Sequence, residues 1–414
     1  MTLRVDSDRV THQLQVLSTF SAAPAPAVTR IVFSGEDQQA RAYVRSLCED
    51  AGLALREDAI GNLFARWIGD EPSLPAVCTG SHIDAIPNAG MYDGTVGVLG
   101  ALEAIRALQA SGLRPRRSIE LLMFTSEEPT RFGIGCLGSR LLSGMPDATV
   151  GERLRDRDGS TLDQVRQSAG FSGDLSGVAL PPGAYSAFVE LHIEQGPLLE
   201  AHGIGLGVVT AIAAPASLRV TVLGEGGHAG AVLMPHRRDA LVAAAEIALA
   251  VETAARSTGA IDTVATTGVC HVFPGAVNSV PSRCDLEIDV RDIDRARRDA
   301  VLARIDAACS DVAARRGVSV ATQVVNADPP ARCDAAVVDA LSASCRDAGF
   351  AFEPMISRAY HDALFMARIA PTAMLFIPCR AGVSHRPDEY ASPDDIARGV
   401  RVLALTLARL ANAG

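Results

Sequence analysis

The sequence has few aromatic residues and no excess of positive charge. It contains one tryptophan and five tyrosines among 414 residues, which argues against an aromatic platform for carbohydrate or nucleic acid. Its net charge is −10, from 38 basic and 48 acidic side chains, so no general electrostatic attraction draws it to nucleic acid or anionic lipid. We therefore expect neither a nucleic-acid partner nor a membrane partner.

Thiolate metal sites and membrane-spanning segments are also missing from the sequence. The nine cysteines include no C-x-x-C pair, and their odd number favours reduced thiols over a disulfide framework. No run of 18 uninterrupted apolar residues is present, so no transmembrane helix is expected. Residues Met1–Asp8 lack the basic and apolar regions of a secretory signal. These absences predict a cytoplasmic protein.

The residues that are present predict a globular α/β protein. Hydrophobic residues make up 48% of the chain and charged residues 21%, which is enough to build a large core. Apolar residues recur at helical spacing over 40–51 and 96–108, whereas 119–125 and 186–193 are nearly continuous apolar runs. Helices that alternate with buried strands indicate a mixed-sheet α/β fold.

The middle of the chain follows a different pattern. Residues 283–290 alternate strictly between polar and apolar side chains, as expected for an antiparallel sheet with one wet face. Helices are predicted near 239–253 and 293–315, and Pro/Ala-rich segments flank the region. We therefore predict a discontinuous catalytic domain over 1–211 plus 328–414, with an α+β domain inserted over 212–327.

Histidines and carboxylates gather where the predicted strands end. Taken singly, each histidine is more simply a structural residue, but the order and setting of the whole group point to metal binding. Three histidines with carboxylates and no thiolates suit divalent ions such as Zn²⁺, Mn²⁺ or Co²⁺. One shared carboxylate could hold two ions about 3.5–4 Å apart. The candidate residues are His82, Asp84, Asp93, Glu127, Glu128, His192 and His385.

Six short motifs contain most of these candidate residues. They are Ser81-His-Ile-Asp84, Tyr92-Asp-Gly94, Glu127-Glu-Pro129, Glu190-Leu-His-Ile-Glu-Gln-Gly-Pro197, Gly227-His-Ala-Gly230 and Ser384-His-Arg-Pro387. Together they resemble the M20 metallopeptidase superfamily, and within it the hydantoinase/carbamoylase amidase family. The resemblance covers nearly the whole chain, and it implies a catalytic domain with an inserted lid or dimerisation domain.

The resemblance also implies roles for the metal-site residues. His82 and His192 would bind one ion, Glu128 and His385 the other, and Asp93 would bridge them. Asp84 would orient His82. Glu127 would be the general base, which takes a proton from water and passes it to the leaving nitrogen. The family implies two divalent ions per subunit, with Mn²⁺ favoured and Zn²⁺, Co²⁺ or Ni²⁺ as alternatives.

Substrate-binding roles follow from the same resemblance. His228 would stabilise the oxyanion, and Asn278 and Arg291 would hold a substrate carboxylate. In a homodimer, His228 and Asn278 would reach the partner's site. Arg291 could instead be an ion-pair partner, and Asn278 a turn residue. The further substrate-binding candidates are Gln195, Tyr360, His361 and Ser384.

Two segments, residues 355–362 and 224–235, favour one substrate within the amidase family. Where many members have a glycine-rich segment before His-Asp, this chain has Arg358-Ala-Tyr360, which resembles the ureidoglycolate amidohydrolases. The resemblance implies hydrolysis of the carbamoyl C–N bond of (S)-ureidoglycolate, whose hydroxyl Tyr360 could read. Tyr360 could also simply pack in the core.

Other activities remain open from the sequence alone. Within the amidase family, the alternatives are allantoate and N-carbamoyl-L-amino acid amidohydrolases, including the β-ureidopropionase type. An aminopeptidase or dipeptidase of the superfamily, or a metal-free binding protein, is less consistent with these motifs and with the complete ligand set.

Overall fold

The structure is a computed structural model that describes residues 3–145 and 149–413. The chain forms two compact units. The main domain comprises the chain up to Thr210, Cys333–Ser357, and the chain from His361 onward. The inserted domain comprises Ala211–Arg332 together with Arg358–Tyr360. Among the described residues, no helix combines the length and apolarity needed to cross a membrane.

The main domain is built on a mixed β-sheet. Its strands run in the order β8-β17-β7-β4-β6-β3-β2, and β16 pairs with β8. The pairs β17·β7, β7·β4 and β4·β6 are parallel, whereas β8, β3 and β2 are antiparallel to their neighbours. A short ladder of β1 and β5 lies apart. The strands are β1 (Val28–Arg30), β2 (Ala54–Glu57), β3 (Leu63–Trp67), β4 (Ala76–His82), β5 (Ala85–Ala89), β6 (Ile119–Phe124), β7 (Tyr185–Ile193), β8 (Gly207–Ile212), β16 (Glu353–Ser357) and β17 (Thr372–Ile377).

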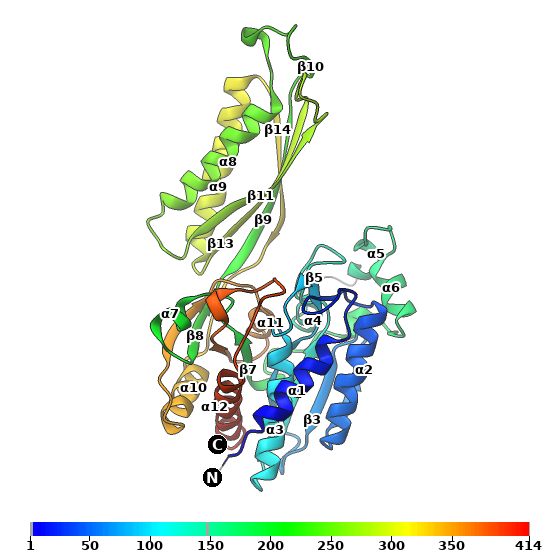
Figure 1. Ribbon diagram of the computed structural model, residues 1–414, viewed down its shortest axis with the longest axis vertical. Coiled ribbons are helices and arrows are strands. Elements are labelled where there is room, and N and C mark those ends of the chain that lie inside the picture. Colours follow the sequence, from blue (N-terminus) through cyan, green and yellow to red (C-terminus); the bar gives the residue numbers. More distant parts are fainter. Residues whose placement is uncertain (1–2, 146–148, 414) are drawn as a thin grey trace. The chain divides into compact units, whose positions relative to one another are not determined.

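Helices cover both faces of this sheet. Two long helices, α3 and α12, pack on each other and on the central strands, and α11 packs on β7 and β17 with α4 beside it (Figure 1). The four central strands β4, β6, β7 and β17 are therefore almost wholly buried, which explains their continuous apolar runs. The helices are α1 (Ser7–Ser18), α2 (Gly35–Asp50), α3 (Thr95–Ala110), α4 (Leu137–Leu142), α5 (Val150–Arg153), α6 (Leu162–Ser168), α7 (Leu198–His202), α10 (Ala335–Asp347), α11 (Asp362–Met366) and α12 (Pro393–Ala411).

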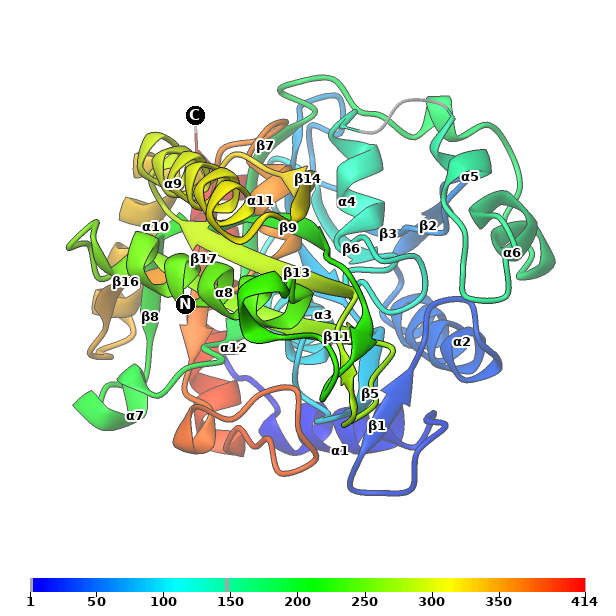
Figure 2. The same ribbon diagram turned by 90° about the horizontal axis from the view of Figure 1, so that it is seen from above.

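The inserted domain is a four-stranded antiparallel sheet with two helices on one face. Its strand order is β11-β13-β9-β14, and α8 and α9 lie side by side along it (Figure 2). Every second residue of β13 is buried under these helices, which explains the polar and apolar alternation in the sequence. The elements are β9 (Ala214–Leu223), β10 (Gly227–His228), α8 (Ala240–Arg256), β11 (Val264–Phe273), β12 (Ser279–Val280), β13 (Arg283–Asp292), α9 (Arg295–Arg316), β14 (Ser319–Ala327) and β15 (Ala331–Arg332).

The fold class predicted from the sequence is confirmed: a mixed-sheet α/β domain carries an α+β insertion. The inserted unit extends to Arg332, beyond the expected boundary at residue 327, because β15 pairs with Ala211 and Ile212 at the end of β8.

Candidate functional site

A cluster of ionisable side chains lies at the carboxyl ends of the central parallel strands. His82 is the last residue of β4, His192 lies one residue before the end of β7, and Glu127 and Glu128 follow β6. Asp93 lies in the loop that leads into α3. All five side chains are buried. The carboxyl ends of strands at the centre of an α/β sheet are where such folds place their ligands.

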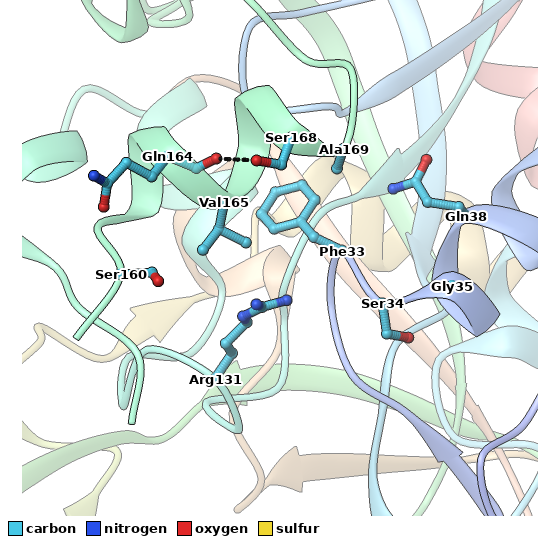
Figure 3. Close-up of a pocket in the computed structure, with 10 residues that line it drawn as sticks. All are labelled: Phe33, Ser34, Gly35, Gln38, Arg131, Ser160, Gln164, Val165, Ser168 and Ala169. Atoms are coloured by element: carbon cyan, nitrogen blue, oxygen red, sulfur yellow. Dashed lines mark hydrogen bonds between the residues drawn. The ribbon is translucent and has the colours of Figure 1, made fainter. Parts of the chain in front are cut away.

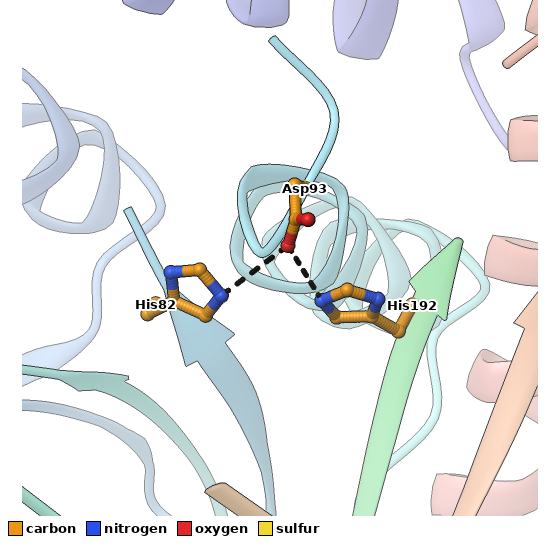
Figure 4. A group of neighbouring side chains, drawn as sticks. All are labelled: His82, Asp93 and His192. Atoms are coloured by element: carbon orange, nitrogen blue, oxygen red, sulfur yellow. Dashed lines mark ion pairs between the residues drawn. The ribbon is translucent and has the colours of Figure 1, made fainter. Parts of the chain in front are cut away.

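Asp93 lies at the centre of the cluster. Its Oδ1 atom is 3.5 Å from His82 Nε2 and 3.2 Å from His192 Nε2 (Figure 4). Its Oδ2 atom faces another histidine, with His385 Nε2 at 3.3 Å. His385 Nε2 is also 3.4 Å from Glu128 Oε1. The two oxygens of Asp93 are therefore shared between two separate groups of ligand atoms.

The geometry of these two groups fits divalent metal ions. In His82–Asp93–His192 and in Asp93–Glu128–His385, one atom from each residue lies within 4.8 Å of the others. Tetrahedral ligands about 2.0–2.1 Å from an ion are about 3.3 Å from one another, close to the 3.2–3.5 Å separations around Asp93. The donor set of imidazoles and carboxylates also suits such ions.

The charges of the cluster favour bound cations. Burial alone would raise the pKa of Asp93, but hydrogen bonds with the three histidines hold that pKa well below its usual range. Burial and the Asp93 charge raise the pKa of Glu128 to about 7. The hydrogen bond to Asp93 raises the pKa of His385 to about 9. These buried acids repel one another, and positive charge between them would offset that repulsion.

Asp84 joins the ends of two strands. His82 Nδ1 is 3.1 Å from the main-chain carbonyl oxygen of Asp84 and 3.6 Å from its carboxylate Oδ1. The carboxylate accepts hydrogen bonds from the backbone N–H groups of Glu127, at 3.2 Å, and Glu128, at 3.0 Å. Asp84 thus lies against His82 with both its carbonyl and its carboxylate, and the same carboxylate fixes the segment that carries the two glutamates.

Glu127 has the surroundings of an acid–base group. Its Oε2 atom is 3.7 Å from His82 Nε2, and its Oε1 atom accepts a weak hydrogen bond from the Cys136 thiol at 3.3 Å. Burial, reinforced by the Glu128 charge and opposed by His82, raises the pKa of Glu127 well above its ordinary value. A carboxyl group with a raised pKa can both take up and release a proton near neutral pH.

Two predicted substrate residues contact Asp93. Gln195 Nε2 donates to Asp93 Oδ2 at 2.6 Å, and Ser384 Oγ lies 2.8 Å from the same oxygen. The Oε1 atom of Gln195 is buried and has no hydrogen-bond partner. The structure therefore brings both residues to the cluster of side chains around Asp93.

His361 packs edge-to-face against the imidazole ring of His192. The two imidazole ring centroids are 4.6 Å apart with an edge-to-face tilt of 66°, and His361 Nε2 is 2.9 Å from Ser357 Oγ. Glu190, His192 and His361 form a third group of potential ligands. Glu190, however, already accepts hydrogen bonds from Ser81 Oγ at 2.7 Å and from the Ala363 N–H at 3.0 Å.

The remaining predicted substrate residues belong to the inserted domain. His228 in β10 pairs with Ser279, and the carbonyl of Asn278 accepts the N–H of Ala229, so His228 and Asn278 are neighbours. Arg291 Nε donates to Asp289 at 2.8 Å, which is the ion pair that the sequence left open. Tyr360 Oη donates to Asp328 Oδ2 at 3.2 Å.

Three buried groups at the site were not predicted from the sequence. Glu190 shares a strand face with His192, an i, i+2 relation that could have indicated it. Glu389 follows His385 by four residues and contacts the Asp93 loop. Cys136 contacts Glu127 because the chain folds back on itself over the nine positions that separate them, which no sequence motif indicates.

The structure also has a cavity of about 310 Å³ in the main domain that is separate from this cluster. None of its lining residues belongs to the metal cluster, and Arg131 there is already paired with Asp156 at 3.2 Å. The residues that line it, shown in Figure 3, are Phe33, Ser34, Gly35, Gln38, Arg131, Ser160, Gln164, Val165, Ser168 and Ala169.

Comparison with known proteins identifies the family. Residues 78–409 match the model of peptidase family M20/M25/M40. The chain belongs to this family. The family is metal-dependent, in agreement with the candidate ligand groups, and the resemblance inferred from the motifs is confirmed.

Individual relatives cover nearly the whole chain. The ureidoglycolate hydrolase of Arabidopsis thaliana is 54% identical, over 99% of this chain and 87% of the relative. Solved structures of AtUAH in complex with glyoxylate and with (S)-hydroxyglycine match with TM-scores of 0.93 and 0.92, each at 53% identity over 99% of both chains. The N-carbamoyl-L-amino acid amidohydrolase of Geobacillus stearothermophilus is 37% identical, over 98% of this chain and 99% of the relative.

Proposed function

We propose that this protein is a metal-dependent amidohydrolase that cleaves the carbamoyl C–N bond of (S)-ureidoglycolate. The observation that carries the proposal is the cluster around Asp93, in which two ligand groups share one carboxylate and Glu127 lies beside them. The choice of substrate is supported by the 54% identity to a ureidoglycolate hydrolase over 99% of the chain.

The ligand groups suit two divalent ions per subunit. His82 and His192 would hold one ion, Glu128 and His385 the other, and Asp93 would contact both. Mn²⁺ is the first candidate, with Zn²⁺, Co²⁺ and Ni²⁺ as alternatives that the same donors accept. When bound, such ions lower the pKa of water and polarise a carbonyl group.

Glu127 is the residue that moves protons in this scheme. It takes a proton from the attacking water and gives it to the nitrogen that leaves the carbamoyl carbon. Its raised pKa, caused by burial and by Glu128, suits both steps. Addition of one water and cleavage of this C–N bond gives carbamate and hydroxyglycine. Carbamate yields CO₂ and ammonia, and hydroxyglycine yields glyoxylate and a second ammonia.

Other side chains would bind the substrate. Three of them lie around the cluster: Gln195, His361 and Ser384. Three others belong to the inserted domain: His228, Asn278 and Arg291. Tyr360 would form a hydrogen bond with the substrate hydroxyl. In a homodimer, His228 and Asn278 would serve the partner's site. Arg291 would bind the substrate carboxylate with the N–H groups that Asp289 and the Arg358 carbonyl leave free, because its fork offers five donors.

The cysteines support a cytoplasmic location. All nine are free thiols, as expected of a protein kept in a reducing compartment.

The strongest alternative is a carbamoylase or an allantoate amidohydrolase, since the carbamoylase of Geobacillus stearothermophilus is 37% identical. Bulky Arg358 and Tyr360 favour the smaller ureidoglycolate.

A substrate panel tests the choice directly. Purified protein supplied with Mn²⁺ is assayed for ammonia release from ureidoglycolate, allantoate and an N-carbamoyl-L-amino acid. We expect ureidoglycolate to have by far the highest kcat/KM. Protein that leaves ureidoglycolate intact and cleaves either of the others would overturn the substrate assignment while leaving the amidase class standing.

A further inference from the structure

A buried carboxylate outside the ligand groups connects the two halves of the candidate metal site. Glu389 lies in the segment between β17 and α12, four residues after His385, and is only 5% exposed. Its backbone N–H donates to the carbonyl of Arg386 at 3.1 Å, which turns its side chain back toward the cluster. Glu389 lies outside the six sequence motifs and outside the proposed ligand groups.

The Glu389 carboxylate contacts the loop that carries Asp93 and the loop that carries His385. Its Oε1 atom accepts the backbone N–H groups of Tyr92, at 2.9 Å, and Asp93, at 3.1 Å. Its Oε2 atom is 2.9 Å from Ser384 Oγ, which also lies 2.8 Å from Asp93 Oδ2. One side chain thus fixes the backbone of Asp93 and the residue directly before His385.

The loop before Asp93 is shaped around this side chain. A Cβ atom placed on Gly90 would lie 2.3 Å from Glu389 Cβ and 2.5 Å from its Cδ and Oε1 atoms. Such distances leave no room for any side chain at residue 90 while Glu389 keeps its place. Gly90 and Glu389 therefore form one fitted contact, 299 positions apart in the sequence.

These contacts join the loop that carries Asp93 to the loop that carries His385. Asp93 Oδ2 and His385 Nε2 are 3.3 Å apart, although they lie on loops from opposite ends of the chain. Groups behind metal ligands orient them, and their loss typically costs about 10–100-fold in metal affinity. We propose that Glu389 is a positioning residue that sets the spacing of Asp93 and His385, so that the ligand group Asp93–Glu128–His385 can bind its ion.

This inference rests on the proposed metal site. Two substitutions distinguish the effect of the length of the Glu389 side chain from the effect of its charge. Glu389→Gln keeps the length of the side chain: its carbonyl oxygen can accept both N–H groups, and its amide can donate to Ser384 Oγ. Glu389→Asp keeps the charge but withdraws the carboxylate by one methylene. A positioning role predicts that the Gln variant is tolerated and the Asp variant is not. A purely electrostatic role predicts the reverse.

The test is a titration of metal-free protein with Mn²⁺, followed by the paramagnetic resonance signal of free Mn²⁺. Wild-type protein and Glu389→Gln should bind two ions per chain with similar affinity. Glu389→Asp should bind one of the two about 10–100-fold more weakly. Asp388→Asn is the matched control, because it removes a charge from the adjacent, exposed residue, whose carboxylate pairs with Arg386 at the surface. It should bind as the wild type does.

Each result bears on a separate claim. If Glu389→Asp does not fold, Gly90→Ala takes its place, since its new Cβ would displace Glu389, and it should show the same loss. Wild-type affinity for both ions in Glu389→Asp or in folded Gly90→Ala would overturn the positioning role. Equal weakening in Glu389→Gln and Glu389→Asp would also overturn it. Wild-type protein that binds no Mn²⁺ would overturn the metal site itself.

Discussion

Replacement of Asp84 by Asn should reduce catalysis through the position of Glu127. The Asp84 carboxylate accepts the N–H groups of Glu127 and Glu128 at 3.2 and 3.0 Å, and the side chain is buried. Asn offers one acceptor oxygen, so one of these N–H groups would face an amide that cannot accept its proton. The substitution therefore removes one hydrogen bond to a charged group and leaves a buried donor unpaired.

The magnitude follows from that single lost bond. A hydrogen bond to a charged group contributes about 1.5–3 kcal/mol. If this bond holds Glu127 in its reacting position, kcat should fall by about 10- to 150-fold, since each 1.36 kcal/mol is a factor of ten. KM should change little, because Asp84 lies behind the ligands and has no direct contact with substrate in this account.

The assay is steady-state ammonia release with the metal content measured on the same samples. Asp334→Asn is the control for the loss of charge alone, because Asp334 accepts two consecutive backbone N–H groups, of Ala336 and Val337, through a single oxygen that Asn retains, at the start of α10. It should keep normal kcat. A kcat within twofold of wild type for Asp84→Asn, at full metal content, would refute the role given to Asp84.

Three further predictions follow from particular contacts. Glu127→Gln should lower kcat by at least about 10²-fold with both ions still bound, and a near-normal rate would contradict its role as base. Gly94→Ala should lose metal, because its Cβ would lie 2.4 Å from His82 Nε2. Gly112→Ala is the control and should retain metal, because Gly112 has a similar positive φ but nothing lies within 4 Å of the added Cβ. Equal metal contents in the two variants would contradict the site geometry. A thiol reagent at pH 8 should label one cysteine per native chain, the exposed Cys270. Burial raises the pKa of other thiols to about 12, namely those of Cys48, Cys345 and Cys379. Rapid labelling of several cysteines would contradict this burial.

Local patterns in the sequence were sufficient to predict the fold class. The apolar run at 119–125 became β6 and the run at 186–193 became β7, because strands covered on both faces are apolar at most of their positions. The alternation over 283–290 became β13 for the opposite reason, since only one face of the inserted sheet is covered. Such patterns are properties of neighbouring residues, so the sequence alone displays them.

The site was only partly predictable, because its contacts join distant segments. The ligand residues were recognised from motifs, each of which lies within a few neighbouring positions. Glu389 accepts N–H groups from residues 296 and 297 positions away, and no local pattern encodes such a contact. The Asp84 carboxylate was expected beside His82, and its Oδ1 atom lies 3.6 Å from His82 Nδ1. Its two hydrogen bonds to backbone N–H groups across the sheet were not predicted, because they form only once β4 and β6 pair.

The product balance from (S)-ureidoglycolate tests the central claim most directly. Hydrolysis at the carbamoyl carbon predicts two ammonia molecules for each glyoxylate, no urea, and loss of activity when a chelator removes the metal. Restoration by Mn²⁺ should return the same ratio. Release of urea with glyoxylate, or full activity in protein shown to be free of metal, would contradict the account.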